Sequence, residues 1–409
     1  MIIRLTSLLP YFVFVSIIQG VIEGMYFISP NLVSTVTYAR YLILFLSASV
    51  VLLLFLKFKK AFHIIFIFLV IFFSLLLLSL FFQSMRSIEI RFDKFTITSV
   101  ISGFSLIVAW IYTYMYESSF LNQHSCGKIL AKIISLTLII GFIAVGLILN
   151  FQGSLNLQPV RPDGISLRYS QDLTSFFGIL ALISFYGFVE LKVHWFKKLF
   201  ILISCAIFLT YTFIGGARGE LLSSLFVMFF IIFTADDSNL IRKVCYILFI
   251  IIAIVMSYIF GFLDRFVFLI DSDFENARFD IYITIINNLF VEDMILLGNG
   301  FNFTQSLFPI RMYDSHNFVL DIVLTYGWML GLIFMIFLIH GLYKINKYSL
   351  PMSRLLYMCM LFHIIIFLKS GSLENGIILS IVSFVMSISI YHLSSSLFKI
   401  NNTIDFKFK

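Results

Sequence analysis

The chain has 409 residues, of which 61% are hydrophobic and only 12% are charged. A chain of this composition cannot surround its core with a soluble surface, so an ordinary soluble globular enzyme is excluded. The sequence instead predicts an all-α, polytopic integral membrane protein, for which we expect no nucleic-acid partner.

Apolar runs recur along the whole sequence, each long enough to cross a bilayer as a helix. We expect about twelve transmembrane helices in one membrane domain of residues 1–409. Their expected spans are 5–22, 36–56, 61–82, 97–116, 129–150, 173–190, 199–214, 220–234, 244–262, 318–340, 355–370 and 376–393.

The basic residues predict the orientation of these helices. With a cytoplasmic N-terminus, the inner loops and the tail carry mainly lysine: Lys57, Lys59, Lys60, Lys128, Lys132, Lys192, Lys197, Lys198, Arg242, Lys243, Lys344, Lys347, Arg354, Lys399, Lys407 and Lys409. The outer loops then carry mainly arginine: Arg40, Arg86, Arg91, Lys94, Arg161, Arg168, Arg218, Arg265, Arg278, Arg311 and Lys369. This inside bias predicts that both termini are cytoplasmic.

The concentration of arginine on the outer face indicates a ligand that carries phosphate. Lysine and arginine satisfy a topology rule equally well, but only arginine offers a rigid fork that matches phosphate oxygens. The alternative is that these arginines extend to lipid headgroups or pair with the acidic residues of the same loops.

Two outer loops are longer than a compact helical bundle requires. The first covers residues 151–171 and contains Arg161 and Arg168. The second, residues 263–315, is the large periplasmic loop between the ninth and tenth spans, and loops of this length are usually functional or disordered. Its middle places Phe279, Ile283, Ile286 and Phe290 at helical spacing and ends at Gly298 and Gly300, which predicts an amphipathic helix against the membrane or the bundle.

Two arginines occupy notable positions on the outer side. Arg218 lies in the short glycine-rich turn "FIGGARGELL" between two spans, where an arginine is costly without an anionic partner. Arg278 precedes the amphipathic helix. The alternatives are a turn with one solvated charge for Arg218, and an ion pair with Glu275 or Asp280 for Arg278.

His316 and Asn317 lie where the tenth span begins, with Asp314 or Ser315 expected to cap the helix. A helix N-terminus disfavours positive charge, so an imidazole there stays neutral and can accept a proton. The alternative role for a single histidine at this position is capping or interfacial contact. Farther along, the spacing of Gly327 and Gly331 indicates close packing against another helix. The cysteines Cys126, Cys205, Cys245 and Cys359 are scattered singly and are expected to be inert.

The order of these motifs carries a family resemblance. "GGARGELLSS", "NARFDIY" with "LLGNGFN", and "SHNFVLDIVLTYGWMLGLIF" follow one another over residues 160–380, and this order resembles the O-antigen polymerase and O-antigen ligase superfamily. In that superfamily a short Arg-Gly turn precedes a long periplasmic loop, which ends in a His-Asn helix start.

The resemblance implies a metal-independent glycosyltransferase without a cofactor, in the bacterial inner membrane and with its active site facing the periplasm. The donor would be glycan on undecaprenyl diphosphate. His316, Arg218 and Arg278 would be catalytic, the histidine as base and the arginines on the diphosphate. Arg168, Arg311, Arg161 and Asn317 are weaker, substrate-binding candidates. Membrane lipids, a chain-length regulator and a flippase are the implied partners.

Polymerase and ligase use the same donor and differ in the acceptor, which is another lipid-linked repeat unit or the lipid A core. A chain rich in Phe and Ile with few prolines favours the polymerase. A flippase or other transporter is the alternative from a different class. Transporters place ionisable groups near the membrane midplane on broken helices, and the sequence offers only Asp321 and Lys369, both near span ends.

Overall fold

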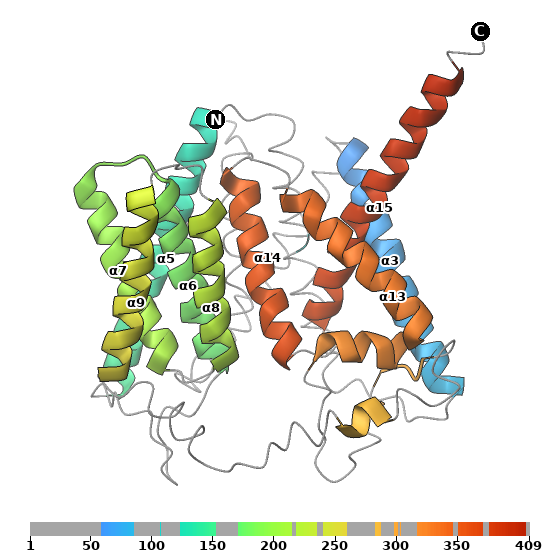
Figure 1. Cartoon of the computed structure of the whole chain (residues 1–409), viewed down its shortest axis with the longest axis horizontal. Coiled ribbons are helices and arrows are strands. Elements are labelled where there is room, and N and C mark those ends of the chain that lie inside the picture. Colours follow the sequence, from blue (N-terminus) through green and yellow to red (C-terminus); the bar gives the residue numbers. More distant parts are fainter. Residues whose placement is uncertain are drawn as a thin grey trace. The chain divides into compact units, whose positions relative to one another are not determined.

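The computed structural model describes residues 59–85, 107, 123–152, 171–214, 218–234, 240–259, 283–287, 298–301, 303, 317–346, 351–370 and 376–405. This part of the chain contains helices but no strand (Figure 1). The long helices are α3 (Lys59–Met85), α5 (Gln123–Gln152), α6 (Gln171–Glu190), α7 (Trp195–Ile214), α8 (Arg218–Thr234), α9 (Leu240–Ile259), α13 (Phe318–Asn346), α14 (Pro351–Ser370) and α15 (Gly376–Asp405).

Each of these helices coincides with one of the expected spans, and most are longer than expected. The expected spans 5–22, 36–56 and 97–116, apart from residue 107, lie outside the described residues. So does most of the large loop 263–315. The apolar runs therefore locate the helices of the described part correctly.

Five helices of the described part are long and apolar enough to cross a membrane. They comprise His63–Met85, Gly127–Gly146, Trp195–Phe213, Phe318–Asn346 and Ile378–Ser395. Large apolar side chains such as Leu222, Phe226 and Phe233 of α8 are exposed on the protein surface. Exposure of so many apolar side chains to water would be strongly unfavourable, so the protein is embedded in a membrane. It is an all-α membrane protein, as the composition predicts.

The chain forms two compact units, which are described here separately. Unit 1 consists of Met1–Leu46, Phe120–Phe274 and Leu350–Ile366. Unit 2 consists of Ser47–Ser119, Glu275–Ser349 and Phe367–Lys409. Unit 1 thus contains helices α5 to α9 and most of α14, whereas unit 2 contains α3, α13 and α15.

Helix α6 is the core of unit 1. Most of its described side chains are buried, and it packs most extensively against α7 and also against α5 and α8. The ring of Phe177 stacks on Tyr211 of α7, with ring centroids 4.8 Å apart. Gly178 allows α8 to come close, because a Cβ atom there would lie 2.7 Å from Ser224 Oγ. Because α6 is packed against other helices on several sides, its sequence is apolar on all of its faces.

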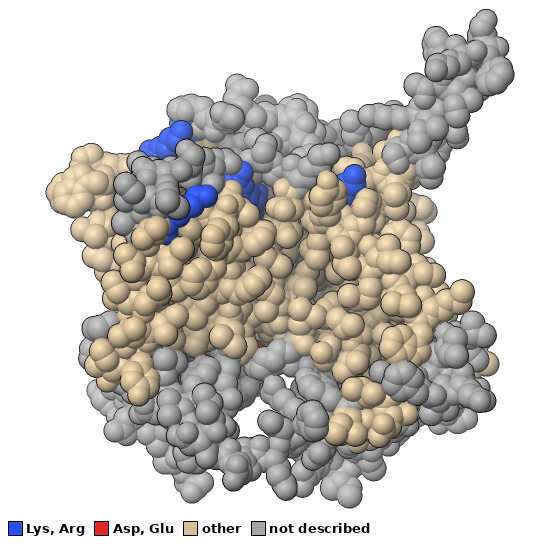
Figure 2. Space-filling model, viewed as in Figure 1, with Lys and Arg blue, Asp and Glu red and all other residues tan. Residues whose placement is uncertain are grey.

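The described lysines of unit 1 lie at one end of its helices. Residues 191–194 join α6 to α7 and residues 235–239 separate α8 from α9, so consecutive helices run in opposite directions. The lysine end, as we call it, carries Lys128, Lys132, Lys192, Lys197, Lys198 and Lys243. Figure 2 shows basic side chains at one end of the helices of unit 1, which lie on the left of the view. The lysines that the positive-inside rule grouped together therefore lie together in unit 1.

The described part of unit 2 is built on three long helices, α3, α13 and α15. Helix α15 packs extensively against α13 and α3, and its apolar residues from Ile378 to Ile388 are buried. Gly341 of α13 lies directly against the backbone of Val385, where a Cβ atom would overlap the carbonyl oxygen. The third pairing, α13 with α3, is reinforced by the short segment Gly298–Phe301, which forms part of the candidate site.

Candidate functional site

Most of the predicted site residues lie outside the described residues. His316, Arg278, Arg168, Arg311 and Arg161 are in this group. The structure describes the backbone of Arg218 and the whole of Asn317. Arg218 belongs to unit 1 and Asn317 to unit 2.

Arg218 is the first residue of α8. Helix α7 ends at Ile214, and only residues 215–217 separate the two helices. The connection between the two helices is therefore as short as "FIGGARGELL" predicts. Within unit 1, this turn lies at the end opposite the lysine end, because α7 and α8 each run from one end to the other.

A buried carboxylate, which the sequence interpretation missed, follows in the first turn of α8. Glu220 is only 1% exposed. An acidic side chain near a helix N-terminus is favoured by the partial positive charge there. Below it, Ser223 Oγ and Ser224 Oγ donate hydrogen bonds to the carbonyls of Gly219 and Glu220, at 2.6 and 2.8 Å. The signal was available, since an ionisable residue inside an apolar span is a functional candidate by default.

Helix α13 is broken near one-third of its length. Gly327 has φ 82° and ψ 167°, a backbone conformation that is essentially limited to glycine. The break divides α13 into a proximal segment, residues 318–326, and a distal segment, residues 328–346 (Figure 1). A break at this point interrupts the i→i−4 hydrogen bonds and leaves the last carbonyls of the proximal segment without helical partners.

The two glycines that were expected to pack against another helix have different roles. Gly327 forms the break, and Gly331 faces the proximal segment of its own helix, where a Cβ atom would lie 3.2 Å from Val323 Cγ2. Close helix packing is therefore confirmed for Gly331, although the packed partner is the proximal segment of the same helix. The small residue at 331 permits the two segments of α13 to fold closely together.

The segment Gly298–Phe301 supplies the missing partners at the break. The N–H groups of Asn299 and Gly300 donate hydrogen bonds of 2.9 and 3.0 Å to the carbonyls of Leu324 and Thr325. Gly298 lies so close that a Cβ atom would overlap Thr325 O. These bonds provide hydrogen-bond partners for the carbonyl groups that the break leaves free. Irregular backbone inside a membrane protein requires such partners, because no water is available there.

Helix α3 holds the other side of the same segment. The N–H of Phe301 donates to Ser79 Oγ at 2.8 Å, and Gln83 Nε2 donates to the carbonyl of Phe301 at 2.6 Å. One turn before Ser79, the carbonyl of Leu75 accepts a hydrogen bond of 3.1 Å from the Tyr326 hydroxyl. The polar groups of α3 at positions 75, 79 and 83 share one face and fix both the segment and the break.

Gly300 also requires the backbone freedom of glycine. Its φ is +76°, and a Cβ atom there would overlap the carbonyl oxygen of Ser79. The "GNG" of the sequence, interpreted only as the end of an amphipathic helix, therefore has a second role. It brings the chain into contact with α3 and α13 at once.

Asn317 caps α13. Its Oδ1 accepts hydrogen bonds from the N–H groups of Val319 at 3.0 Å and Leu320 at 3.3 Å, and its own carbonyl accepts from the N–H of Asp321. The expectation that Asp314 or Ser315 would cap the helix is therefore wrong. Of the candidates in "DSHN", the asparagine has the position from which a side-chain oxygen reaches the N2 and N3 amides.

Asp321 is a second buried carboxylate, and it lies in the first turn of α13. It is 5% exposed, although the sequence indicated only that it stood near a span end. Its location one turn after the cap places its charge where the helix N-terminus stabilises an anion. Unit 2 thus presents a capped helix start, a buried carboxylate and a braced helix break within one short stretch.

The short helix at 283–287 packs on this proximal segment through a different face from the one expected. Ile285 is fully buried in a cluster with Val323 and Leu324, whereas Ile283 and Ile286 are more than 40% exposed. Contact with the bundle is confirmed, but the expected apolar face of Ile283 and Ile286 points away from it. The other expected members of that face, Phe279 and Phe290, lie outside the described residues.

The described residues include no group of three or more His, Cys, Asp or Glu side chains that could hold a metal ion. Cys205 and Cys359 are buried free thiols. No family model matches this sequence, and no curated protein is significantly similar to it.

Proposed function

We propose that the protein is an O-antigen polymerase, an enzyme that joins oligosaccharide repeat units carried on undecaprenyl diphosphate. The observation that supports this function best is the braced proximal segment of α13. It begins at the cap Asn317, directly after His316, and it is held by the segment Gly298–Phe301. A reaction on a lipid-linked substrate requires catalytic groups held rigidly near the level of the lipid headgroups, and a braced half-helix suits this requirement.

In the proposed mechanism, a hydroxyl of the acceptor glycan attacks the anomeric carbon of the donor. The new glycosidic bond forms as the bond from that carbon to the diphosphate oxygen breaks, and the electron pair leaves with the diphosphate. Arg218 and Arg278 bind the diphosphate and stabilise the charge that grows on it. His316 accepts the proton of the attacking hydroxyl. Arg168, Arg311, Arg161 and Asn317 contribute to substrate binding.

We further propose about twelve transmembrane helices in the bacterial inner membrane, with both termini in the cytoplasm. By the positive-inside rule, the lysine end of unit 1 should face the cytoplasm, which supports this topology. The turn before Arg218 then faces the periplasm. In unit 2, Lys344 lies near the C-terminal end of α13 and Asn317 at its start, which agrees with the same assignment.

A ligase would use the same donor and the same arginines, and no described residue distinguishes the two acceptors. A transporter is favoured by one observation, since α13 is a broken helix with the buried Asp321 nearby. In transporters, however, the carbonyls freed by a break coordinate the transported ion. Here the carbonyls of Leu324 and Thr325 accept hydrogen bonds from the chain's own backbone, so the break supports an enzyme better.

The glycan phenotype of a deletion strain tests this proposal. Lipid A core that carries a single repeat unit is the expected result for a polymerase. Bare core with stored lipid-linked polymer would identify a ligase instead, and repeat units trapped on the cytoplasmic leaflet would identify a flippase.

Complementation of that strain tests the proposed base. The His316→Ala variant should be inserted in the membrane at the normal level and yet restore no chain extension, whereas the matched His194→Ala variant, altered at the lysine end, should restore it fully. Long chains made by the His316→Ala variant would remove this residue from the mechanism.

A further inference from the structure

A cluster of basic side chains lies far from the candidate site, near the C-terminal end of α13. The Lys344 cluster, as we call it, consists of His340 and Lys344 from α13 and Ser389 and His392 from α15. His340 Nδ1 lies 2.7 Å from Ser389 Oγ, which fixes the imidazole ring against α15. Lys344 follows His340 by one turn of α13, and His392 follows Ser389 by about one turn of α15, so both residues extend the contact between these two packed helices.

A stripe of exposed apolar side chains leads along α13 to this cluster. Its members are Met329, Leu332, Ile336, Ile339 and Tyr343, each between 55% and 66% exposed. They recur every three or four residues and therefore occupy one face of the distal segment. Lys344 Nζ lies 5.9 Å from the centroid of the Tyr343 ring, so the charge sits directly at the end of the stripe.

The stripe is long enough to contact a lipid acyl chain along the whole length of that chain. From Met329 to Tyr343 a helix rises about 20 Å, whereas the hydrocarbon of one leaflet is about 15 Å thick. Acyl chains can therefore lie along the stripe while a headgroup reaches the cluster. The imidazole N–H groups and the ammonium group of Lys344 are all able to donate hydrogen bonds to phosphate oxygens.

We propose that the Lys344 cluster and the stripe form a binding site for one anionic phospholipid. The phosphate would be held by Lys344 and His392, with His340 positioned by Ser389. Basic groups between transmembrane helices are a recurrent way of holding anionic headgroups. A free phosphate ion would use the same donors, but the exposed stripe favours a ligand that carries acyl chains. This proposal is independent of the proposed glycosyl transfer.

Native mass spectrometry of the purified full-length protein tests the proposal. The detergent-solubilised protein is titrated with phosphatidylglycerol and, separately, with phosphatidylcholine of the same acyl chains. We expect one tightly retained phosphatidylglycerol and a clear preference over phosphatidylcholine. Lys344→Gln should weaken this binding by about fivefold, the contribution of one basic residue near the membrane surface. Lys344→Arg should retain it.

Two controls separate the site from general effects. Lys198→Gln removes the same charge from the lysine end of unit 1 and should leave the tightly retained lipid in place. Inorganic phosphate at the same concentration as the lipid should not displace it, whereas displacement would identify a free anion as the ligand. Equal binding of the two lipids, or unchanged binding by Lys344→Gln, would overturn the proposal. Unchanged thermal unfolding of each variant in detergent shows that the fold is retained.

Discussion

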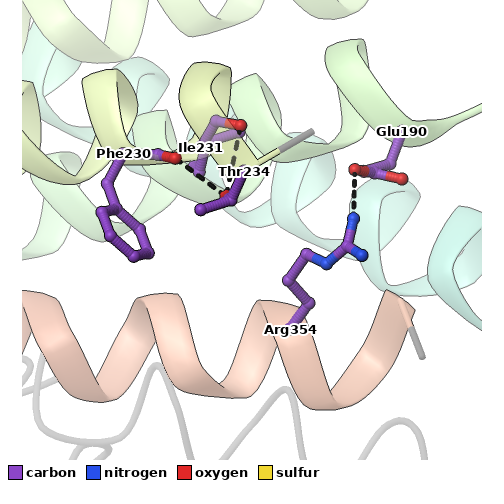
Figure 3. Close-up of polar contacts among 5 residues, drawn as sticks. All are labelled: Glu190, Phe230, Ile231, Thr234 and Arg354. Carbon is purple, nitrogen blue, oxygen red and sulfur yellow. Dashed lines mark hydrogen bonds and ion pairs between the residues drawn. The ribbon is translucent and has the colours of Figure 1, made fainter. Parts of the chain in front are cut away.

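Arg354 Nη1 of α14 lies 3.2 Å from Glu190 Oε1 at the end of α6, and both side chains are no more than 15% exposed (Figure 3). Arg354 is one of the inner basic residues from which the sequence predicts the orientation of the helices. In the structure its charge is compensated by a carboxylate from another helix of unit 1. A nearly buried pair of this kind fixes the start of α14 against α6, but it is not free of cost, because both groups lose their hydration.

Removal of one partner of this pair should destabilise unit 1. Arg354→Met removes the ion pair from the nearly buried Glu190 carboxylate, and we expect a loss of about 3 kcal/mol in the free energy of unfolding. Unfolding of the purified protein in detergent, followed by circular dichroism, measures this loss. Lys197→Met, an exposed lysine near the same end, is the matched control and should change little. The double variant Arg354→Met with Glu190→Leu should recover most of the loss, and a double variant as unstable as the single one would contradict this account.

Gly300 should tolerate no side chain. Its φ of +76° is unfavourable for alanine, and the added Cβ atom would overlap the Ser79 carbonyl oxygen. We expect Gly300→Ala to cost at least about 1 kcal/mol from the backbone conformation, with more from the overlap. The matched control is Gly146→Ala in α5, where a Cβ atom meets nothing within 4 Å. That variant should be neutral or slightly more stable. Equal thermal stability of the two variants would show that the segment Gly298–Phe301 is not closely held.

The break at Gly327 should be needed for activity. Alanine strongly disfavours φ 82° with ψ 167°, so Gly327→Ala favours a continuous helix and opposes the hydrogen bonds of Asn299 and Gly300 to the proximal segment. We expect loss of chain extension in the complemented deletion strain, with the protein still inserted in the membrane. Gly146→Ala serves again as the control and should be fully active. Normal glycan length with Gly327→Ala would show that the break has no role in the reaction.

The helices were predictable from the sequence, and the break was not. A run of apolar residues is sufficient to locate a helix such as α6 or α7, and no other information was needed for these two. The spacing of Gly327 and Gly331 is equally compatible with a packed helix and with a broken one. The choice depends on the segment Gly298–Phe301, which lies some distance away in the sequence and whose two N–H groups compensate the break. Hydrophobic periodicity contains no signal for such a contact.

The helix cap and the two buried carboxylates show a similar limit. "DSHN" offers three residues that can cap a helix, and only the geometry of Asn317 selects one of them. Glu220 lies two residues after Arg218 in the motif "FIGGARGELL", and the sequence shows its charge but not its burial. Burial decides its importance, and burial depends on the packing of α8 against α6.

Glu220 should matter for activity more than for folding. A carboxylate that is 1% exposed, two residues after Arg218, can act on the charges of the proposed diphosphate site. Glu220→Gln keeps the size of the side chain and removes the charge, so we expect normal membrane insertion and a reduction of about tenfold or more in glycan extension. Lys197→Gln, which removes an exposed charge at the lysine end, is the control and should retain extension. Normal glycan extension by Glu220→Gln would leave this carboxylate with a structural role only.

Asn317 can be tested for two roles at once, because they respond differently to the same substitutions. As a cap it can be replaced by aspartate without loss, whereas Asn317→Ala should cost about 1 kcal/mol of stability. As a group that contacts the diphosphate donor, it should not tolerate aspartate, since a negative charge would repel the phosphate oxygens. We therefore expect Asn317→Asp to unfold at the normal temperature in detergent and to lose chain extension. Asn317→Ser, which caps without adding charge, separates the two effects further, since any loss it shows reports the missing amide group. If Asn317→Asp extends glycan as the unaltered protein does, the residue acts only through Val319 and Leu320, as the cap of α13.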